Sequence, residues 1–199
     1  MDFIFAGFIE AIRLLFGGDA QTWSAVSATL KGSTGSILTS LVLGIPRGFV
    51  LGYFDFPARR QARLVVDTAL ALPTVFIGLI VYAFISQRGP LGGMGLLFTL
   101  PGIGVGQTIL ALPVVAALSA TAVESMDRHL RTLLISLGAS RRQLLISSLW
   151  EVRFGLLAAG LAAYGRVMTE VGISMMVGGN IKWHTRTITT AIALETGKG

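Results

Sequence analysis

The sequence predicts an all-α fold, a polytopic bundle of transmembrane helices. Of the 199 residues, 53% are hydrophobic and only 13% are charged. About a quarter of the residues in an ordinary soluble domain are charged, so this composition does not suit a soluble fold. The apolar residues form runs, and a run of about 20 such residues is long enough for a helix to cross a bilayer. We therefore expect one membrane domain over residues 1–199, with spans at 24–54, 64–85, 105–123 and 154–177.

The N-terminal segment is too short to cross a membrane. Residues 3–16 mix apolar side chains with Glu10 and Arg13, and the run ends at the Gly17-Gly18 pair. A helix lying in the membrane interface and a partly buried first helix are equally consistent with this pattern. The first residues lack the basic region and the cleavage site of a signal peptide.

Small residues mark faces of the first and fourth spans. Gly44, Gly48 and Gly52 recur every four residues, which places them on one side of a helix. Without side chains, this face allows a second helix to approach closely. Small residues in the fourth span have the same spacing, and we expect helices to slide or rock on both faces: Gly155, Ala159 and Ala163.

Prolines predict irregularities inside the spans. Pro46 lies in the first span and Pro73 in the middle of the second. Proline has no backbone N–H and its ring clashes with the preceding turn, so we expect a bend at each position. The carbonyl that Pro73 leaves free has to be satisfied by a neighbouring helix or a hydroxyl side chain.

Polar side chains within the spans are candidates for a translocation pathway. Arg166 and Glu170 are four residues apart, so on one continuous helix they would share a face and neutralise each other. A charge in mid-membrane costs about 2.5–3.5 kcal/mol on insertion scales. The pair is therefore either beside the pathway or subunit interface, or a structural ion pair. The candidate pathway or gate residues are Gln107, Arg166, Glu170 and Asn180.

A polar interruption separates the third and fourth spans, over about 124–153. It contains five of the sixteen Lys/Arg residues, and Leu137-Gly138-Ala139-Ser140 lies in its middle. Ser140 and Gln143 have the spacing of a capping box, which predicts a helix start. Gly138 can adopt the left-handed conformation that closes a preceding helix. We expect two short helices joined at Gly138.

The distribution of basic residues predicts the orientation. The segment around Arg59, Arg60 and Arg63 and the 124–153 interruption together carry eight Lys/Arg, and the remaining non-span segments carry five. Cytoplasmic loops are enriched in Lys and Arg. We therefore expect the 124–153 loop in the cytoplasm and the N-terminus outside.

Several function classes have no support in the sequence. The chain has no Cys and no Gly-x4-Gly-Lys-Ser/Thr nucleotide loop, and His129 and His184 are far apart. No catalytic pair, metal-ligand cluster or cofactor motif is present, so we expect no enzyme activity, no cofactor and no metal. The net charge of +6 comes from residues between apolar runs, which indicates membrane loops rather than nucleic-acid binding.

The loop and the fourth span resemble the permease subunits of ABC importers. In those permeases a Glu-Ala-Ala-x-x-x-Gly motif marks the cytoplasmic coupling loop; here Thr132-Leu133-Leu134 replaces Glu-Ala-Ala, while Gly138-Ala139-Ser140 fits. The runs 165–172 and 176–181 are similar to the molybdate, tungstate and sulfate branch, and most similar to the tungstate type. Further segments that carry the likeness are 89–92, 96–99, 185–187 and 189–196.

The resemblance implies a type I, molybdate-permease-like fold in a prokaryotic inner membrane. It implies a homodimer in membrane lipid, with two ATP-binding cassette subunits, an extracytoplasmic binding protein and an oxyanion substrate. Family members normally continue with another span, so we expect that the last transmembrane helix is missing from this sequence. The coupling residues implied are Thr132, Leu133, Leu134, Gly138, Ala139, Ser140, Arg141 and Arg142.

Basic residues after the fourth span are candidates for an outer mouth. Lys182, His184 and Arg186 would attract an oxyanion, or they form a solvated loop or a contact with the binding protein. Because the binding protein sets selectivity in this family, we expect no deep anion site here. The function predicted is ATP-driven uptake of tungstate by alternating access. Molybdate or sulfate uptake, a secondary transporter or channel working without an ATPase, and a membrane scaffold are the alternatives.

Overall fold

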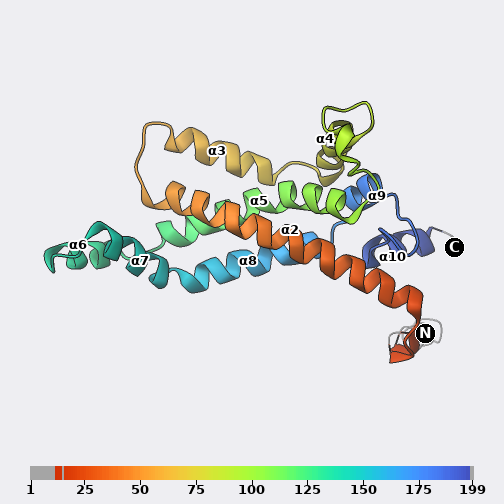
Figure 1. Cartoon of the computed structure of the whole chain (residues 1–199). Coiled ribbons are helices and arrows are strands. Elements are labelled where there is room, and N and C mark those ends of the chain that lie inside the picture. The colour runs from red at the N-terminus through yellow and green to blue at the C-terminus, as the bar shows by residue number, and fades with distance from the viewer. Residues whose placement is uncertain (1–11, 15, 198–199) are drawn as a thin grey trace. The chain divides into compact units, whose positions relative to one another are not determined.

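A computed structural model describes residues 12–14 and 16–197, and every regular element within them is a helix (Figure 1). The prediction of an all-α fold is confirmed. Most of the segment 3–16, predicted as an interfacial helix or a partly buried first helix, lies outside the described residues. The elements are α2 (Ala20–Tyr53), α3 (Arg59–Leu70), α4 (Thr74–Ile85), η1 (Gly92–Met94), α5 (Leu100–Glu124), α6 (Arg128–Ser136), α7 (Arg141–Glu151), α8 (Arg153–Met168), α9 (Gly172–Gly178) and α10 (Ile188–Thr196).

Within the described residues, two helices are individually long and apolar enough to cross a membrane: α2, with 34 residues, and α5, with 25. They match the predicted spans at 24–54 and 105–123. Pro46 and Pro113 lie inside these helices and do not end them. The pairs α3 with α4 and α7 with α8 meet the same criteria only when each pair is taken as one broken span.

The predicted second span, 64–85, is not one kinked helix: the predicted interruption around Pro73 is present, as a full break between two helices. The helix ends at Leu70, and a new one begins at Thr74. Pro73 is extended, with φ −61° and ψ 134°, and it precedes the first residue of α4. Proline disfavours the helical conformation in the residue before it, so the interruption begins at Leu72 rather than appearing as a kink.

The predicted fourth span, 154–177, is wrong as a single helix. The 16-residue helix α8 is about 24 Å long at the α-helical rise, and it ends at Met168. The Glu170 carboxylate then accepts a hydrogen bond from the Ile173 N–H at 3.0 Å. Such side-chain hydrogen bonds compete with helix continuation and start the next helix instead. The predicted placement of Arg166 and Glu170 on one continuous helix is therefore incorrect.

The chain divides into two compact units, and one of them contains residues 36–72 and 108–167. In this unit the Gly44, Gly48 and Gly52 face of α2 packs on α5. A Cβ atom added at Gly48 would lie 2.5 Å from the Ala116 carbonyl oxygen and 2.6 Å from the Ser119 Cβ. The predicted close approach is confirmed, because the two backbones meet where only glycine fits.

The core of this unit consists of small and branched apolar side chains. Ala163 and Val167 of α8 pack with Ile37, Ala111 and Val115. A second cluster lies near the opposite ends of these helices and contains Phe49, Val123 and Val152. The small-residue face predicted for α8 is buried here, since Ala159 and Ala163 are almost inaccessible to solvent.

Of the described residues, the other unit contains 12–14, 16–35, 73–107 and 168–197. In it α4 packs against α9, and a Cβ atom added at Gly78 would lie 3.0 Å from the Met176 sulfur. The helix α10 begins at Thr187 with a complete capping box. The Ile188 N–H donates to the Thr29 hydroxyl at 2.9 Å, which connects the start of α10 to α2 within this unit.

The start of α2 is stabilised by Asp19. Its carboxylate accepts hydrogen bonds from the Thr22 hydroxyl at 2.7 Å and from the Thr22 N–H at 2.8 Å. These bonds favour the charged form, so the pKa of Asp19 lies below its usual value.

Candidate functional site

The predicted helix–glycine–helix loop is present between α5 and α8. Gly138 has a φ of +78°. Its N–H donates to the Ile135 carbonyl at 3.0 Å, and the Ala139 N–H donates to the Leu134 carbonyl at 3.0 Å. This pair of bonds is a Schellman motif, which satisfies carbonyl groups that the end of α6 would otherwise leave unpaired.

The start of α7 is fixed by the predicted capping box. The Gln143 N–H donates to the Ser140 hydroxyl at 3.4 Å, and the Ser140 N–H donates to the Gln143 side-chain oxygen at 2.8 Å. Asp127 caps α6 in a similar way, accepting from the His129 N–H at 2.8 Å. The turn between α6 and α7 is therefore determined at both sides by local hydrogen bonds.

The loop has an exposed surface that combines apolar and basic groups. Leu133 is 59% exposed and Leu137 is 81% exposed, while Arg141 and Arg142 at the start of α7 are also exposed. Of the other residues predicted for coupling, Leu134 and Ala139 are half-buried, and Thr132, Gly138 and Ser140 are exposed. Large exposed apolar side chains next to charges are typical of a protein-binding surface.

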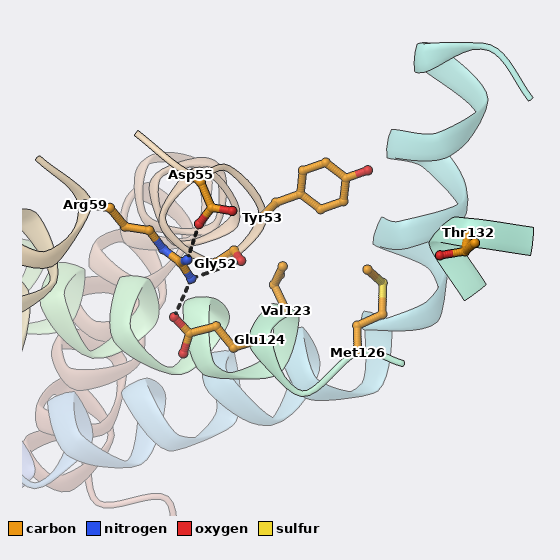
Figure 2. Close-up of a pocket in the computed structure, with 8 residues that line it drawn as sticks. All are labelled: Gly52, Tyr53, Asp55, Arg59, Val123, Glu124, Met126 and Thr132. Carbon is orange, nitrogen blue, oxygen red and sulfur yellow. Dashed lines mark hydrogen bonds and ion pairs between the residues drawn. The ribbon is translucent and has the colours of Figure 1, made fainter. Parts of the chain in front are cut away.

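An arginine network lies at the base of the loop, where α2 and α5 end. The Arg59 guanidinium is 2.6 Å from an Asp55 oxygen and 3.0 Å from a Glu124 oxygen. Its Nε donates to the Leu51 carbonyl at 2.7 Å. Its Nη2 donates to the Gly52 carbonyl at 3.4 Å, so Arg59 also pairs with the last turn of α2 (Figure 2). One side chain from α3 therefore connects the ends of α2 and α5.

Arg63, one turn further along α3, extends this network. It donates to the Thr121 hydroxyl at 2.9 Å, pairs with Asp67 at 3.2 Å, and lies 3.6 Å from the second Glu124 oxygen. Glu124 thus contacts two arginines with its two oxygens. Multiple charge-assisted hydrogen bonds restrict the geometry of the groups that form them.

A pocket of about 410 Å³ adjoins the network. Figure 2 shows Arg59 and Glu124 on one side and Thr132 of α6 on the other, with Tyr53, Val123 and Met126 between them. The pocket therefore lies between the arginine network at the base of the loop and Thr132, one of the predicted coupling residues.

This network was not predicted from the sequence, which placed Arg59, Arg60 and Arg63 in a loop. The structure places all three in α3, so Arg63 and Asp67 are one turn apart. The four-residue spacing of Arg59, Arg63 and Asp67 was a usable signal for a helix with ion pairs. No local pattern connects these residues to Glu124, about 60 positions later in the chain.

The second set of predicted residues, apart from Arg166, lies in the other unit. Gln107 and Glu170 are buried, with exposed fractions of 3% and 6%, and Asn180 is half-buried. Arg186 is buried, whereas Lys182 and His184 are exposed. The structure therefore separates the two residues predicted for an outer mouth: Lys182 faces solvent and Arg186 does not.

Arg186 and Asn180 are in direct contact. The Arg186 Nε donates to the Asn180 side-chain oxygen at 3.1 Å, and the Asn180 amide group donates to the Thr190 carbonyl at 3.4 Å. Arg166 lies in the last turn of α8, where the helix dipole favours a cation. Within residues 12–14 and 16–197, no group of three or more His, Asp or Glu side chains is arranged to hold a metal ion.

Apolar helices joined by an exposed basic helical loop define a multi-pass membrane protein. The chain is 50% identical over all 199 residues to the tungstate uptake system permease protein TupB of Campylobacter jejuni, covering 83% of that protein. It is 39% identical to a probable anion ABC transporter permease of Haloferax volcanii, with 88% of this chain and 78% of the relative aligned. The chain is 32% identical to TupB of Peptoclostridium acidaminophilum, with 100% and 87% aligned.

The chain therefore belongs to the ABC transporter permease family, in the branch that contains the tungstate, molybdate and sulfate system permeases. More distant relatives, a molybdenum permease of Escherichia coli and a sulfate permease of Synechocystis, are both 26% identical to it. No family model matches the chain.

Proposed function

We propose that this chain is the membrane-spanning subunit of a binding-protein-dependent ABC importer for an oxyanion, tungstate first. The observation that carries the proposal is the 50% identity, over the whole chain, to a permease named for tungstate uptake. Molybdate and sulfate are the alternative substrates, since more distant relatives are named for them.

The energy for uptake comes from partner subunits. Two copies of the chain form the pathway in a prokaryotic inner membrane, with two ATPase subunits on the cytoplasmic side and a binding protein outside. The exposed loop around Gly138 docks on the ATPase, with Arg141 and Arg142 facing acidic groups. Closure of the ATPase pair pulls on the loop, and the Arg59–Glu124 network transmits this movement to α2, α3 and α5.

The small-residue contacts allow the helices to move during alternating access. Gly44, Gly48 and Gly52 place backbone against backbone, so α2 and α5 can slide without side chains interlocking. Gln107, Arg166, Glu170 and Asn180 lie along the pathway or gate, and Lys182 and Arg186 form its outer mouth.

Reconstitution of the complete importer tests this function. Proteoliposomes containing permease, ATPase subunits and binding protein should take up tungstate in an ATP-dependent manner, and loaded binding protein should stimulate hydrolysis. Molybdate and sulfate are compared under the same conditions. Uptake that proceeds without the ATPase subunits would instead support a secondary transporter.

The role of the loop is tested by Gly138→Pro. Proline cannot adopt the positive φ of this position, so the turn between α6 and α7 would be lost. We expect hydrolysis to become independent of loaded binding protein while membrane insertion is unchanged. Gly138→Asn is the matched control, because asparagine tolerates the left-handed conformation. Normal substrate-stimulated hydrolysis in the proline variant contradicts the coupling role.

A further inference from the structure

Arg186 is a buried cation without a counter-charge in the described part of the chain. Only 7% of the residue is exposed. Its one side-chain hydrogen bond there is from Nε to Asn180, and no carboxylate of a described residue lies within 4.0 Å of it. A guanidinium carries five N–H donors, so four have no protein acceptor among these residues. The two terminal nitrogens are not fully enclosed, so a group that enters from solvent can reach them. Buried charges in proteins are normally paired, because desolvation without a partner is unfavourable.

The surroundings of Arg186 are polar and well ordered. Thr185, Thr187 and Thr190 are buried around it, and their hydroxyls form hydrogen bonds with each other or with the backbone. Glu170 in the same unit accepts from the Ile173 N–H and forms no ion pair with Arg186. None of these groups compensates the charge of Arg186.

The preceding turn has an unusual backbone that fixes the position of Asn180. Gly179, Asn180 and Trp183 all have positive φ, at 69°, 51° and 68°. This conformation is rare for a bulky residue such as tryptophan and persists only where the surrounding structure enforces it. The Arg186 N–H donates to the Ile181 carbonyl at 3.0 Å, so the turn closes on the arginine itself.

We propose that the Arg186 guanidinium binds the transported oxyanion directly, with Asn180 as the residue that positions it. The inference rests on the proposed function. A tetrahedral dianion supplies both the missing negative charge and several acceptor oxygens, and the planar guanidinium fork binds such groups with two parallel hydrogen bonds. The inference departs from the expectation that the permease has no deep anion site.

Lys182 provides a matched contrast. It carries the same charge four residues away but is exposed, so its ammonium group is solvated and needs no partner. An oxyanion near Lys182 would be attracted weakly through water, whereas at Arg186 it would replace a missing protein partner. The two residues should therefore differ sharply in their effect on anion binding.

The experiment measures anion-dependent thermal stabilisation of the permease–ATPase complex without binding protein. Tungstate or sulfate should raise the unfolding temperature of the unmodified complex, while chloride at equal ionic strength should not. In Arg186→Gln the apparent affinity should fall at least about tenfold, the effect expected for losing charge-assisted hydrogen bonds. Lys182→Gln should weaken the response far less than Arg186→Gln. Arg88→Gln, which removes an exposed cation of the same unit outside the proposed pathway, should respond like the unmodified complex. An unchanged response in Arg186→Gln, or no response in the unmodified complex, overturns the proposal.

Asn180→Asp keeps the proposal testable if the glutamine variant fails to fold. The new carboxylate would lie against Arg186 Nε and act as an internal counter-ion. We expect a higher unfolding temperature without anion and a weaker response to tungstate. An undiminished tungstate response in this variant contradicts direct binding by Arg186.

Failure of this site and failure of the proposed function give different results. If the unmodified importer takes up tungstate and Arg186→Gln binds and transports it equally well, the site is wrong and the function stands. If no oxyanion is transported but anion stabilisation depends on Arg186, the function is wrong and the site stands. If Arg186→Gln impairs only stimulation by the binding protein, Arg186 pairs with a carboxylate of that protein, and the proposal is overturned.

Discussion

Gly138 shows how a single residue determines the geometry of the loop. Its φ of +78° lies in the left-handed region, and a Cβ atom added there would meet no atom within 4 Å. A side chain at this position would therefore be disfavoured by the backbone conformation alone, not by crowding. At Gly138, glycine is therefore required by the backbone conformation and not by close packing.

Gly138→Ala should destabilise the α6–α7 turn by about 1–2 kcal/mol, the cost of a left-handed non-glycine residue. Gly138→Asn should cost less, because asparagine visits this region more readily. Hydrogen exchange of the α6 and α7 amides measures both effects. Equal protection in the alanine variant and the unmodified chain would show that the turn does not depend on glycine.

Glu124 connects two arginines of α3 to the end of α5, and this is open to a double-mutant cycle. The side chains of Arg59 and Glu124 are 32% and 39% exposed, so solvent screens the pair. We expect a coupling energy between Arg59→Gln and Glu124→Gln of about 0.5–1 kcal/mol in unfolding measurements. Asp55→Asn is the control, since the Asp55 side chain is 91% exposed. A coupling energy near zero would show that the network does not stabilise the base of the loop.

The packing of α2 on α5 depends on glycine for a different reason, which is the space between the helices. Gly48→Ala would place a methyl group against the Ala116 carbonyl and Ser119, and backbone atoms cannot move aside cheaply. We expect destabilisation of about 1–3 kcal/mol, as for other overpacked sites. Gly35→Ala in the same helix meets no atom within 4 Å and should be neutral or stabilising. Detergent-titration unfolding distinguishes the two; equal effects would contradict close packing.

Elements determined by neighbouring residues were predictable from the sequence, and those determined by distant ones were not. The capping box at Ser140 and the closure at Gly138 involve residues within a few positions, so their pattern is visible in the chain. The end of α8 is an exception, because the Glu170 carboxylate accepts from the Ile173 N–H only three residues away, in a stretch that resembles a continuing apolar span in sequence. The burial of Arg186 was not predicted, because the basic residues after α9 suggested an anion-attracting mouth, a solvated loop or a contact with the binding protein.

The orientation of the whole molecule in the membrane remains a prediction, based on the excess of Lys and Arg in two loops. The chain has no Cys, so a single introduced thiol reports its own location without background. Ser136 in the coupling loop and His184 after α9 are both exposed and suit this purpose.

In intact cells, a membrane-impermeant maleimide should label His184→Cys, and it should label Ser136→Cys only after permeabilisation. The physical reason is that cytoplasmic loops retain basic residues during insertion. Expression with and without the ATPase subunits provides the control, since docking would protect Ser136→Cys even in permeabilised cells. Labelling of Ser136→Cys in intact cells would place the loop on the side without ATP, and the coupling mechanism would then be untenable.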